Sequence, residues 1–474
     1  MGILKLGGIA SGMDTEGLIT TLMNLERRPL QTLQTRQSKF TTEANAWRDL
    51  NTRMLTLKTR FDDLKGLADG LWTAKKATPS DTTVLTATAA PNAAAGSYTV
   101  NVTALAKATQ WQSGVMSGGP RDDANEDLGL SGTIRVASGP KAGETFAVSA
   151  TDSLTDIAAT INANKADLGF SASVVQVNPG DYRLVIKGET GTTNDFALEN
   201  DGADTLADAL GLTAVGGAVK NSTAANGSLT VNGVTVTTAS NSVTDAIGGT
   251  TLTLLKEGAT TTVTVGNDTQ KIVDAVRKFV DQYNAVVDFI ATQTRYDTKT
   301  KDAGTLFGED RVLSIRDSLS TKMMDPVAGV PDAHNSLVMV GVTTEAYQSG
   351  QKVSGKLVFN AEKFAKALEA DPASVKKLLT GSDGTTKGIA IRATEWLDNY
   401  TRSGGILPGL TETLEKSAAS IKERITNFET QILPMRENRL RAQFTALEKA
   451  MATYQNQGTW LSGQIKSLAS SSGE

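Results

Sequence analysis

Apolar residues at helical spacing dominate the beginning of the chain. From Asp14 to Glu26 they recur every three or four positions, and Pro29 then interrupts the pattern because proline disfavours helix at the residue before it. A longer helix is predicted over residues 30–64, with Gly66 as its end. Two lines of apolar residues repeat every seven positions along it, namely Trp47, Met54 and Phe61, and Leu50, Leu57 and Leu64. This repeat is typical of a helix that packs along another helix.

The carboxy-terminal part carries a similar pattern. Apolar residues step by threes, fours and sevens from Leu410 to Met435, and the register then slips by five residues to Leu440. Pro434 lies beside the slip, so we expect a kink there. The pattern resumes at Phe444, Leu447, Met451, Tyr454, Leu461, Ile465 and Leu468.

Stripes of this kind need a partner helix, and two arrangements provide one. The terminal helices close an ordinary bundle within one chain, or they form a coiled coil with other copies of the chain. We favour the coiled coil, since the helices are long and lie at opposite ends of one chain. The predicted oligomer interface comprises Trp47, Leu50, Met54, Leu57, Phe61, Leu64, Phe444, Leu447, Met451 and Tyr454.

Between the terminal helices the pattern changes to strands. Alternating residues such as Tyr98, Val100 and Val102 predict strands, and turn signals at residues 178–180, 232–233 and 248–249 separate them. Short strands with frequent turns are typical of sandwiches or small barrels. A weak echo between "DSLTDIAATI" (152–161) and "NSVTDAIGGT" (241–250) hints at related β modules.

Helical spacing returns after Thr269. One predicted helix places Ile272, Val276, Phe279, Tyr283, Val287 and Ile290 on one face. A second, with Phe364 and Leu368, ends where Asp371 and Pro372 break it. The predicted fold class is therefore α+β multidomain: long terminal α-helical coiled-coil rods plus a helical/β leg domain, with antiparallel β-sandwich or barrel-like modules inserted between them.

Composition and charge exclude several classes of function. The 474 residues hold 47 Lys plus Arg against 51 Asp plus Glu, a net charge of -4, which argues against a nucleic acid partner. The chain has no cysteine, so disulfides, thiolate nucleophiles and Cys-based zinc sites are excluded. No apolar run approaches the ~18 residues of a membrane span, and the start lacks the apolar core of a secretory signal peptide, so we expect a soluble protein without membrane insertion.

The sequence offers little for catalysis. "GGIASGMDTEG" (7–17) lacks the preceding strand and the Gly-Lys-Ser/Thr of a phosphate-binding loop. We interpret it as a mobile tail in which Ser11 caps the first helix and Asp14 completes a capping box. The single histidine, His334, cannot form a multi-histidine metal site. A carboxylate pair for glycoside hydrolysis stays open, because its separation depends on tertiary structure. We expect no catalytic, cofactor-binding or metal residues, and no cofactor.

Several stretches resemble one known family. "IASGMDTEGLITTLMNLERRPLQTLQ" resembles the amino-terminal signature of the bacterial flagellar filament cap (hook-associated protein 2) family, and "GSYTVNVTALAKATQ" is similar to its first strand module. "TFAVSATDSLTDIAATIN" and "YRLVIKGETGTTNDFAL" resemble the repeat of flagellin-related and cap proteins. "KFVDQYNAVVDFI", "GKLVFNAEKFAKALEADPASVKKLL" and "RAQFTALEKAMATYQNQGTWLSGQI" resemble the carboxy-terminal half in order, and Pro434 is the main departure.

The resemblance implies a structural protein of the bacterial flagellum. It would be exported unfolded through the type III export apparatus, be secreted to the extracellular filament tip, form a ring-like homo-oligomer there and help flagellin to fold and insert. Implied partners are flagellin, the hook-filament junction proteins, an export chaperone that binds the carboxy-terminal helix, and host mucin. Leu461, Ile465 and Leu468 are the residues that we expect to anchor the tip and bind the chaperone. Alternatives are another axial flagellar protein, flagellin-like or from the hook-filament junction, and a secreted adhesin or enzyme acting through the β modules.

The resemblance also suggests a division of the chain. The expected parts are an export tail and terminal coil (1–42), a long leg helix (43–75), the first part of a β head module (76–108), an inserted outer β module (109–215), the second part of the head module (216–268), a helical/β leg domain (269–409) and a carboxy-terminal coiled-coil rod (410–474).

Overall fold

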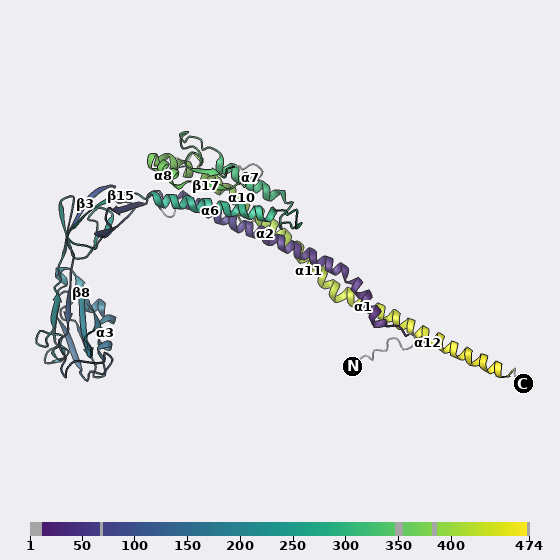
Figure 1. Cartoon of the computed structure of the whole chain (residues 1–474), viewed down its shortest axis with the longest axis horizontal. Helices are drawn as coiled ribbons and strands as arrows, with labels where there is room; N and C mark the ends of the chain where they lie inside the picture. Colours follow the sequence, from purple (N-terminus) through teal and green to yellow (C-terminus); the bar gives the residue numbers. More distant parts are fainter. Residues whose placement is uncertain (1–11, 67–69, 347–353, 382–385, 472–474) are drawn as a thin grey trace. The chain divides into compact units, whose positions relative to one another are not determined.

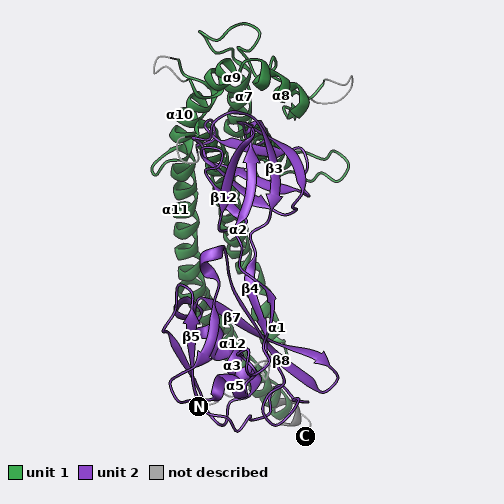
Figure 2. Ribbon diagram, turned by 90° about the vertical axis from the view of Figure 1, so that its left-hand side faces the viewer, with its two compact units in different colours: residues 1–69, 272–474 green, residues 70–271 purple. Residues whose placement is uncertain are grey.

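The computed structural model describes residues 12–66, 70–346, 354–381 and 386–471. The chain forms two compact units, drawn in different colours in Figure 2. Unit 1 combines residues 1–69 with residues 272–474, and unit 2 comprises residues 70–271. Unit 2 is therefore an insertion between the two halves of unit 1.

Unit 1 is mainly helical. Its helices are α1 (Thr15–Glu26), α2 (Arg28–Lys65), α6 (Thr269–Thr294, which begins at the end of unit 2), α7 (Asp310–Met324), α8 (Ala361–Ala370), α9 (Pro372–Thr380), α10 (Ile389–Thr401), α11 (Ile406–Asn427) and α12 (Leu433–Ser471). One short antiparallel pair joins β16 (Val342–Thr344) to β17 (Leu357–Phe359). The predicted helix with Phe364 ends as expected, because Asp371 caps α9 and Pro372 opens it.

The core of unit 1 forms around α2. Figure 1 shows α2 running beside α6 and α11, and α10 also packs on it. The rings of Phe61 on α2 and Phe279 on α6 lie 4.9 Å apart between centroids. The predicted apolar face of α6 is buried throughout, at Ile272, Val276, Phe279, Tyr283, Val287 and Ile290.

The ends of the first two helices are set by local chemistry. Asp14, and not Ser11, is the N-cap of α1: its Oδ1 accepts a hydrogen bond from the Gly17 amide at 2.9 Å. This corrects the predicted capping box, and the expected mobile tail (residues 1–11) lies outside the described residues. Gly66 ends α2 in the left-handed conformation, with φ +65°, as predicted.

A π-helical turn lies between α11 and α12, at Phe428–Ile432. Pro434 follows it and has no amide hydrogen to donate to the carbonyl four residues earlier. The Leu433 amide donates to the Phe428 carbonyl, five residues earlier, which is the hydrogen bond of a π-helix. The irregularity expected beside Pro434 is therefore present, one turn earlier than predicted. It also shifts the register, so that Leu433 is buried and Met435 is exposed, contrary to the predicted stripe.

Unit 2 contains one core between a five-stranded and a three-stranded antiparallel sheet. The five-stranded sheet has the order β1 (Lys75–Pro79), β15 (Ala259–Asn267), β3 (Gly96–Ala104), β11 (Gly227–Val231) and β12 (Val234–Thr238). The three-stranded sheet has the order β13 (Ser242–Thr244), β14 (Thr250–Leu254) and β2 (Leu85–Ala89). Val100, Val102, Leu229, Leu252 and Val263 belong to the core that these sheets contribute.

The predicted turn at Asn232 and Gly233 is the two-residue hairpin between β11 and β12. Both residues have positive φ, +50° and +84°, the combination that a type I′ turn requires. An asparagine followed by a glycine adopts it at low cost, so this local signal was sufficient to predict the hairpin.

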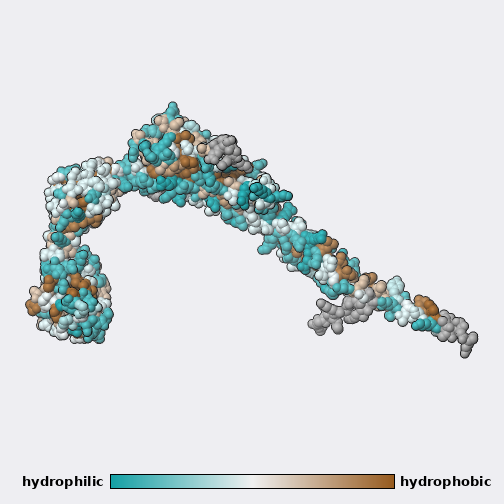
Figure 3. Space-filling view, viewed as in Figure 1, coloured by the Kyte–Doolittle hydropathy of each residue, from teal (hydrophilic) through white to brown (hydrophobic). Residues whose placement is uncertain are grey.

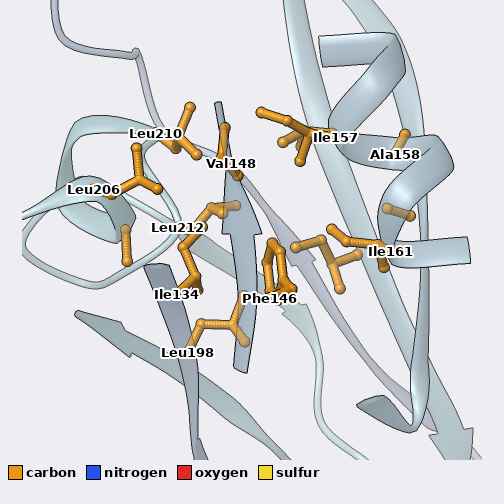
Figure 4. Packing of buried hydrophobic residues seen from close by; sticks show 14 of the residues in the cluster. Ile134, Phe146, Val148, Ile157, Ala158, Ile161, Leu198, Leu206, Leu210 and Leu212 are labelled. Carbon is orange, nitrogen blue, oxygen red and sulfur yellow. The ribbon is translucent and has the colours of Figure 1, made fainter. Parts of the chain in front are cut away.

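A second core of unit 2 is built from sheets and helices. Its four-stranded sheet has the order β10 (Val219–Ser222), β4 (Ala108–Gln112), β8 (Asp181–Thr190) and β7 (Phe170–Asn178). Its three-stranded sheet has the order β6 (Thr145–Val148), β5 (Gly132–Ser138) and β9 (Ala197–Asn200). The helices are α3 (Leu154–Ala163), α4 (Lys165–Leu168) and α5 (Leu206–Ala209). Figure 4 shows Ile157 of α3 directed toward Val148 of β6, and Ile161 toward Phe146, within this core.

The echo between residues 152–161 and 241–250 has no structural counterpart. The first segment forms most of α3, which Ser153 and Asp156 open with a capping box. The second forms β13 and the turn that leads to β14. The similarity of the letters therefore does not mark a repeated module.

Candidate interaction surface on the terminal helices

The predicted stripe of α2 lies inside a single chain. Trp47, Leu50, Met54, Leu57, Phe61 and Leu64 are each at most 3% exposed. Charged side chains beside the stripe pair with the same chain: Arg48 with Glu415, and Lys58 with Asp398 at 2.5 Å. The neighbouring helices of the chain therefore account for the burial of this stripe without a second subunit.

The predicted stripe of α12 is exposed by contrast. Tyr454 is 70% exposed, Leu461 52% and Ile465 62%, and Leu447 and Met451 also reach the surface. Phe444 is half-buried, and Leu468 lies in α12 with its side chain outside the described residues. In Figure 3 apolar side chains come to the surface along this part of the chain. The two sets of predicted interface residues thus have opposite environments.

The exposed stripe keeps one register and lacks charge. From Leu440 to Leu468 its positions step alternately by four and three residues, with Gly458 occupying one of them. Between Lys449 and Lys466 the chain has no charged side chain at all. A helix surrounded by water normally carries charged residues on its polar faces. An uncharged helical segment with an exposed apolar stripe indicates a surface that another protein covers.

The first helix is attached to the beginning of α12. Glu26 pairs with Arg436, and Glu16 pairs with Arg441 at 2.6 Å, so α1 runs antiparallel to α12. The pKa of Arg441 is raised, first by its hydrogen bond to Glu16 and then by its hydrogen bond to Glu437. These ion pairs orient α1 on its neighbour.

An apolar cluster beneath α1 joins four helices. It consists of Ile19, Met23, Leu30, Ile421, Ile425 and Leu433, with Phe40, Phe428, Leu440 and Phe444 among the half-buried residues packed against it. A neighbouring face of α1 leaves Leu18, Leu22 and Leu25 exposed. The predicted site omitted these leucines, although a short helix with apolar residues on two faces is itself a signal of a second partner.

The described residues contain no candidate metal centre. In that part of the chain, no group of three or more His, Cys, Asp or Glu side chains could hold a metal ion. None of its helices is long and apolar enough to cross a membrane. His334 lies in a loop, half-buried, with its amide bonded to the Pro331 carbonyl at 2.8 Å. The candidate functional site is the surface of α1 and α12 on which apolar side chains are exposed.

Comparison with known proteins identifies the family. A protein named flagellar hook-associated protein 2 from Escherichia coli (strain K12) is 30% identical over 483 residues, which cover 98% of this chain and 98% of that protein. The chain belongs to the flagellar hook-associated protein 2 family. An A-type flagellar hook-associated protein 2 from Pseudomonas aeruginosa is 28% identical over 477 residues, and this alignment covers 94% of this chain and 93% of the relative.

The family match extends to separate segments and to a solved structure. The family described as flagellar hook-associated protein 2 N-terminus matches residues 11–109, the corresponding C-terminus matches residues 224–456, and the flagellin hook IN motif matches residues 138–190. A crystal structure of the D1-D2-D3 domains of the flagellar cap protein FliD from Escherichia coli is similar, with a TM-score of 0.52 and 30% identity over 78% of this chain and 99% of that one.

Membership of the flagellar hook-associated protein 2 family assigns a structural role in the flagellar filament cap. It excludes the alternative that the chain is a secreted enzyme, because the family is not an enzymatic one. It also distinguishes the chain from flagellin and from the hook-filament junction proteins. A mixed helical and antiparallel-sheet fold is common to this chain and the solved relative.

Proposed function

We propose that this chain forms a ring-like homo-oligomer at the distal tip of the flagellar filament, where it promotes the folding and insertion of exported flagellin. The single observation that carries the proposal is the exposed, uncharged apolar stripe of α12, from Leu447 to Ile465. The family's role in the filament cap supports a location at the filament tip.

In this proposal the terminal helices of neighbouring subunits form a coiled coil. Heptad stripes bury their apolar side chains by interlocking with the stripe of another helix. Burying Leu461, Ile465 and Leu468 contributes on the order of 5 kcal/mol before the entropy of ordering is subtracted. The exposed leucines of α1 extend the same contact, since α1 is attached to the beginning of α12. The long helix α2 belongs to the interior of each subunit in this arrangement.

In this proposal the β part of the chain comprises two modules of sandwich or barrel-like form. Support for this comes from the paired sheets around each of the two cores of unit 2. Each core has its own set of buried residues, so a module can keep its shape while the terminal helices assemble. Contacts with flagellin through these modules fit a protein that receives new subunits at the tip.

Further partners follow from the life cycle of such a protein. We infer that an export chaperone covers Leu461, Ile465 and Leu468 before secretion, because an exposed apolar stripe invites association in the cell. The type III export apparatus then delivers the chain to the extracellular tip, next to the hook-filament junction proteins during early assembly. Binding of host mucin, with a role in cell adhesion, is a second candidate function for the β modules.

A double substitution tests the proposal. Replacing Leu461 and Ile465 with aspartate introduces charge into the stripe without touching the core of unit 1, so we expect loss of tip attachment and chaperone capture with unchanged thermal unfolding. Flagellin secreted by cells carrying the variant should accumulate in the medium as free subunits. Ser462→Asp, on a neighbouring face, is the matched control and should be tolerated. Normal filaments on cells carrying the double variant would contradict the proposal.

A further inference from the structure

A cavity of about 650 Å³ opens in the part of unit 2 that contains α3, far in sequence from the terminal helices. Its lining comes from the end of β5 and the following loop, from the end of α3 through α4 to the start of β7, and from the end of β8 and the residues after it. Val136, Leu168, Phe170 and Phe196 supply apolar surface, and the rings of Phe170 and Phe196 stack with centroids 4.8 Å apart. This volume is within the range of pockets that bind small molecules or peptide side chains.

The walls of the cavity are held by specific contacts. The side-chain amide of Asn162 donates to the Ala172 carbonyl at 2.8 Å, and its oxygen accepts from the Ala172 amide at 2.9 Å, which ties the end of α3 to β7. Gly169 has φ +77°, and a Cβ there would lie 3.1 Å from Cγ of Lys141. Glycine at this position therefore lets the aliphatic part of Lys141 lie against the wall.

Two lysines and one glutamate are the charged residues among those that line the cavity. Lys165 and Glu189 both line the cavity and pair with each other at 3.2 Å, so their charges offset. Within the described residues, no carboxylate pairs with the half-buried Lys141. The cavity thus combines apolar walls with a net charge of one positive unit. A single carboxylate attached to an apolar group matches this better than a doubly charged phosphate, which is more strongly hydrated.

We propose that the cavity binds an extended segment of a partner polypeptide in which an apolar side chain stands beside one aspartate or glutamate. The apolar side chain enters between Leu168 and Phe196, and the carboxylate accepts a charge-assisted hydrogen bond from Nζ of Lys141. The choice of a polypeptide, rather than a free amphiphile, rests on the proposed function, in which this chain handles other protein subunits. The cavity itself is independent of the α12 stripe.

The test uses the full chain and a labelled peptide. A fluorescein-labelled, amidated hexapeptide with one aspartate between two leucines is titrated with the protein, and binding is followed by fluorescence anisotropy. The same peptide with asparagine in place of aspartate should bind about tenfold more weakly, since the charge-assisted hydrogen bond is lost. Lys141→Met should abolish that difference between the two peptides. Lys187→Met, an exposed lysine of β8 outside the cavity lining, should leave it intact.

Filling the cavity provides a second arm. Ala166→Trp and, independently, Ala163→Trp place a large side chain in the lining and should each remove binding of both peptides while unit 2 unfolds at the same temperature. Equal binding of the aspartate and asparagine peptides to the unmodified protein, or full binding by a correctly folded tryptophan variant, would overturn the proposal. If the protein binds octanoate and neither peptide, the ligand is a free amphiphile, and the proposal of a polypeptide partner is overturned.

The two proposals fail separately. Lys141→Met should still cap filaments, and the Leu461→Asp, Ile465→Asp variant should still bind the aspartate peptide. If the unmodified protein does not bind the peptides although cells that carry it form normal filaments, only the cavity proposal is refuted. Normal filaments with the α12 variant would refute the assembly proposal alone.

Discussion

The stripe of α2 and the stripe of α12 have the same spacing of apolar residues and opposite environments. In α2 the stripe is buried by helices of its own chain, and in α12 it faces outward. The difference lies in the residues beside each stripe. Arg48 and Lys58 flank the α2 stripe and pair with α11 and α10, whereas the α12 stripe has no charged neighbour between Lys449 and Lys466. The spacing indicates that a helix needs a partner, and the flanking charges help to indicate which partner.

The largest difference between the stripes should be found in the stability of the subunit. Phe61→Ala removes a ring packed against Phe279 in the core of unit 1, and such truncations lower the free energy of unfolding by about 3–5 kcal/mol. Tyr454→Ala, at an exposed position, should change it by less than about 0.5 kcal/mol. Urea unfolding of dilute protein measures both. Similar losses for the two variants would show that the α12 stripe also packs within the subunit.

A smaller difference between the stripes should appear in how the stability of the folded chain depends on pH. The hydrogen bond from Lys58 holds the pKa of Asp398 below its ordinary value of 3.8. A carboxylate with a lowered pKa stabilises the folded state above its ordinary pKa, and this contribution is lost as the pH falls through the lowered value. Asp398→Asn should therefore be slightly less stable than the unmodified chain at neutral pH.

The stability difference between these two proteins should close as the pH falls below 3.8. Urea unfolding at neutral pH and at about pH 3 measures it, with Ser462→Asn as a matched exposed control. The residues from 450 to 465 include no carboxylate or amine side chain, so the control should show no such change. A difference that persists unchanged at the lower pH would contradict the role of the Lys58–Asp398 pair.

Local signals in the sequence were sufficient to predict much of the fold. The helix ends at Gly66 and Asp371 and the hairpin at Asn232–Gly233 depend on neighbouring residues alone, so residue type predicts them. The kink expected beside Pro434 is instead a π turn that lies before the proline, because Pro434 acts on hydrogen bonds of the preceding turn. The similar sequences at residues 152–161 and 241–250 wrongly suggested related modules, because similar short sequences can form a helix in one environment and a strand in another.

The candidate sites depended more on tertiary structure. The spacing of the apolar residues identified both stripes, but it could not distinguish burial by α11 from burial by another subunit, since both require the same pattern. The cavity beside Lys141 was beyond the reach of sequence reasoning, because its lining comes from three separated segments of residues 136–196. The exposed face of α1 could have been recognised from its second row of leucines.

The central claim is that copies of this chain meet through the stripe of α12 and not through the stripe of α2. The chain has no cysteine, so single-cysteine variants report contacts between copies without background. Tyr454→Cys, treated with a short bismaleimide at concentrations where light scattering detects assembly, should yield covalently linked subunits in high proportion. Asn456→Cys, exposed on another face of α12, and Met54→Cys, buried in α2, should yield few. Equal cross-linking at Asn456→Cys and Tyr454→Cys, or assembly without cross-linking at Tyr454→Cys, would contradict the claim.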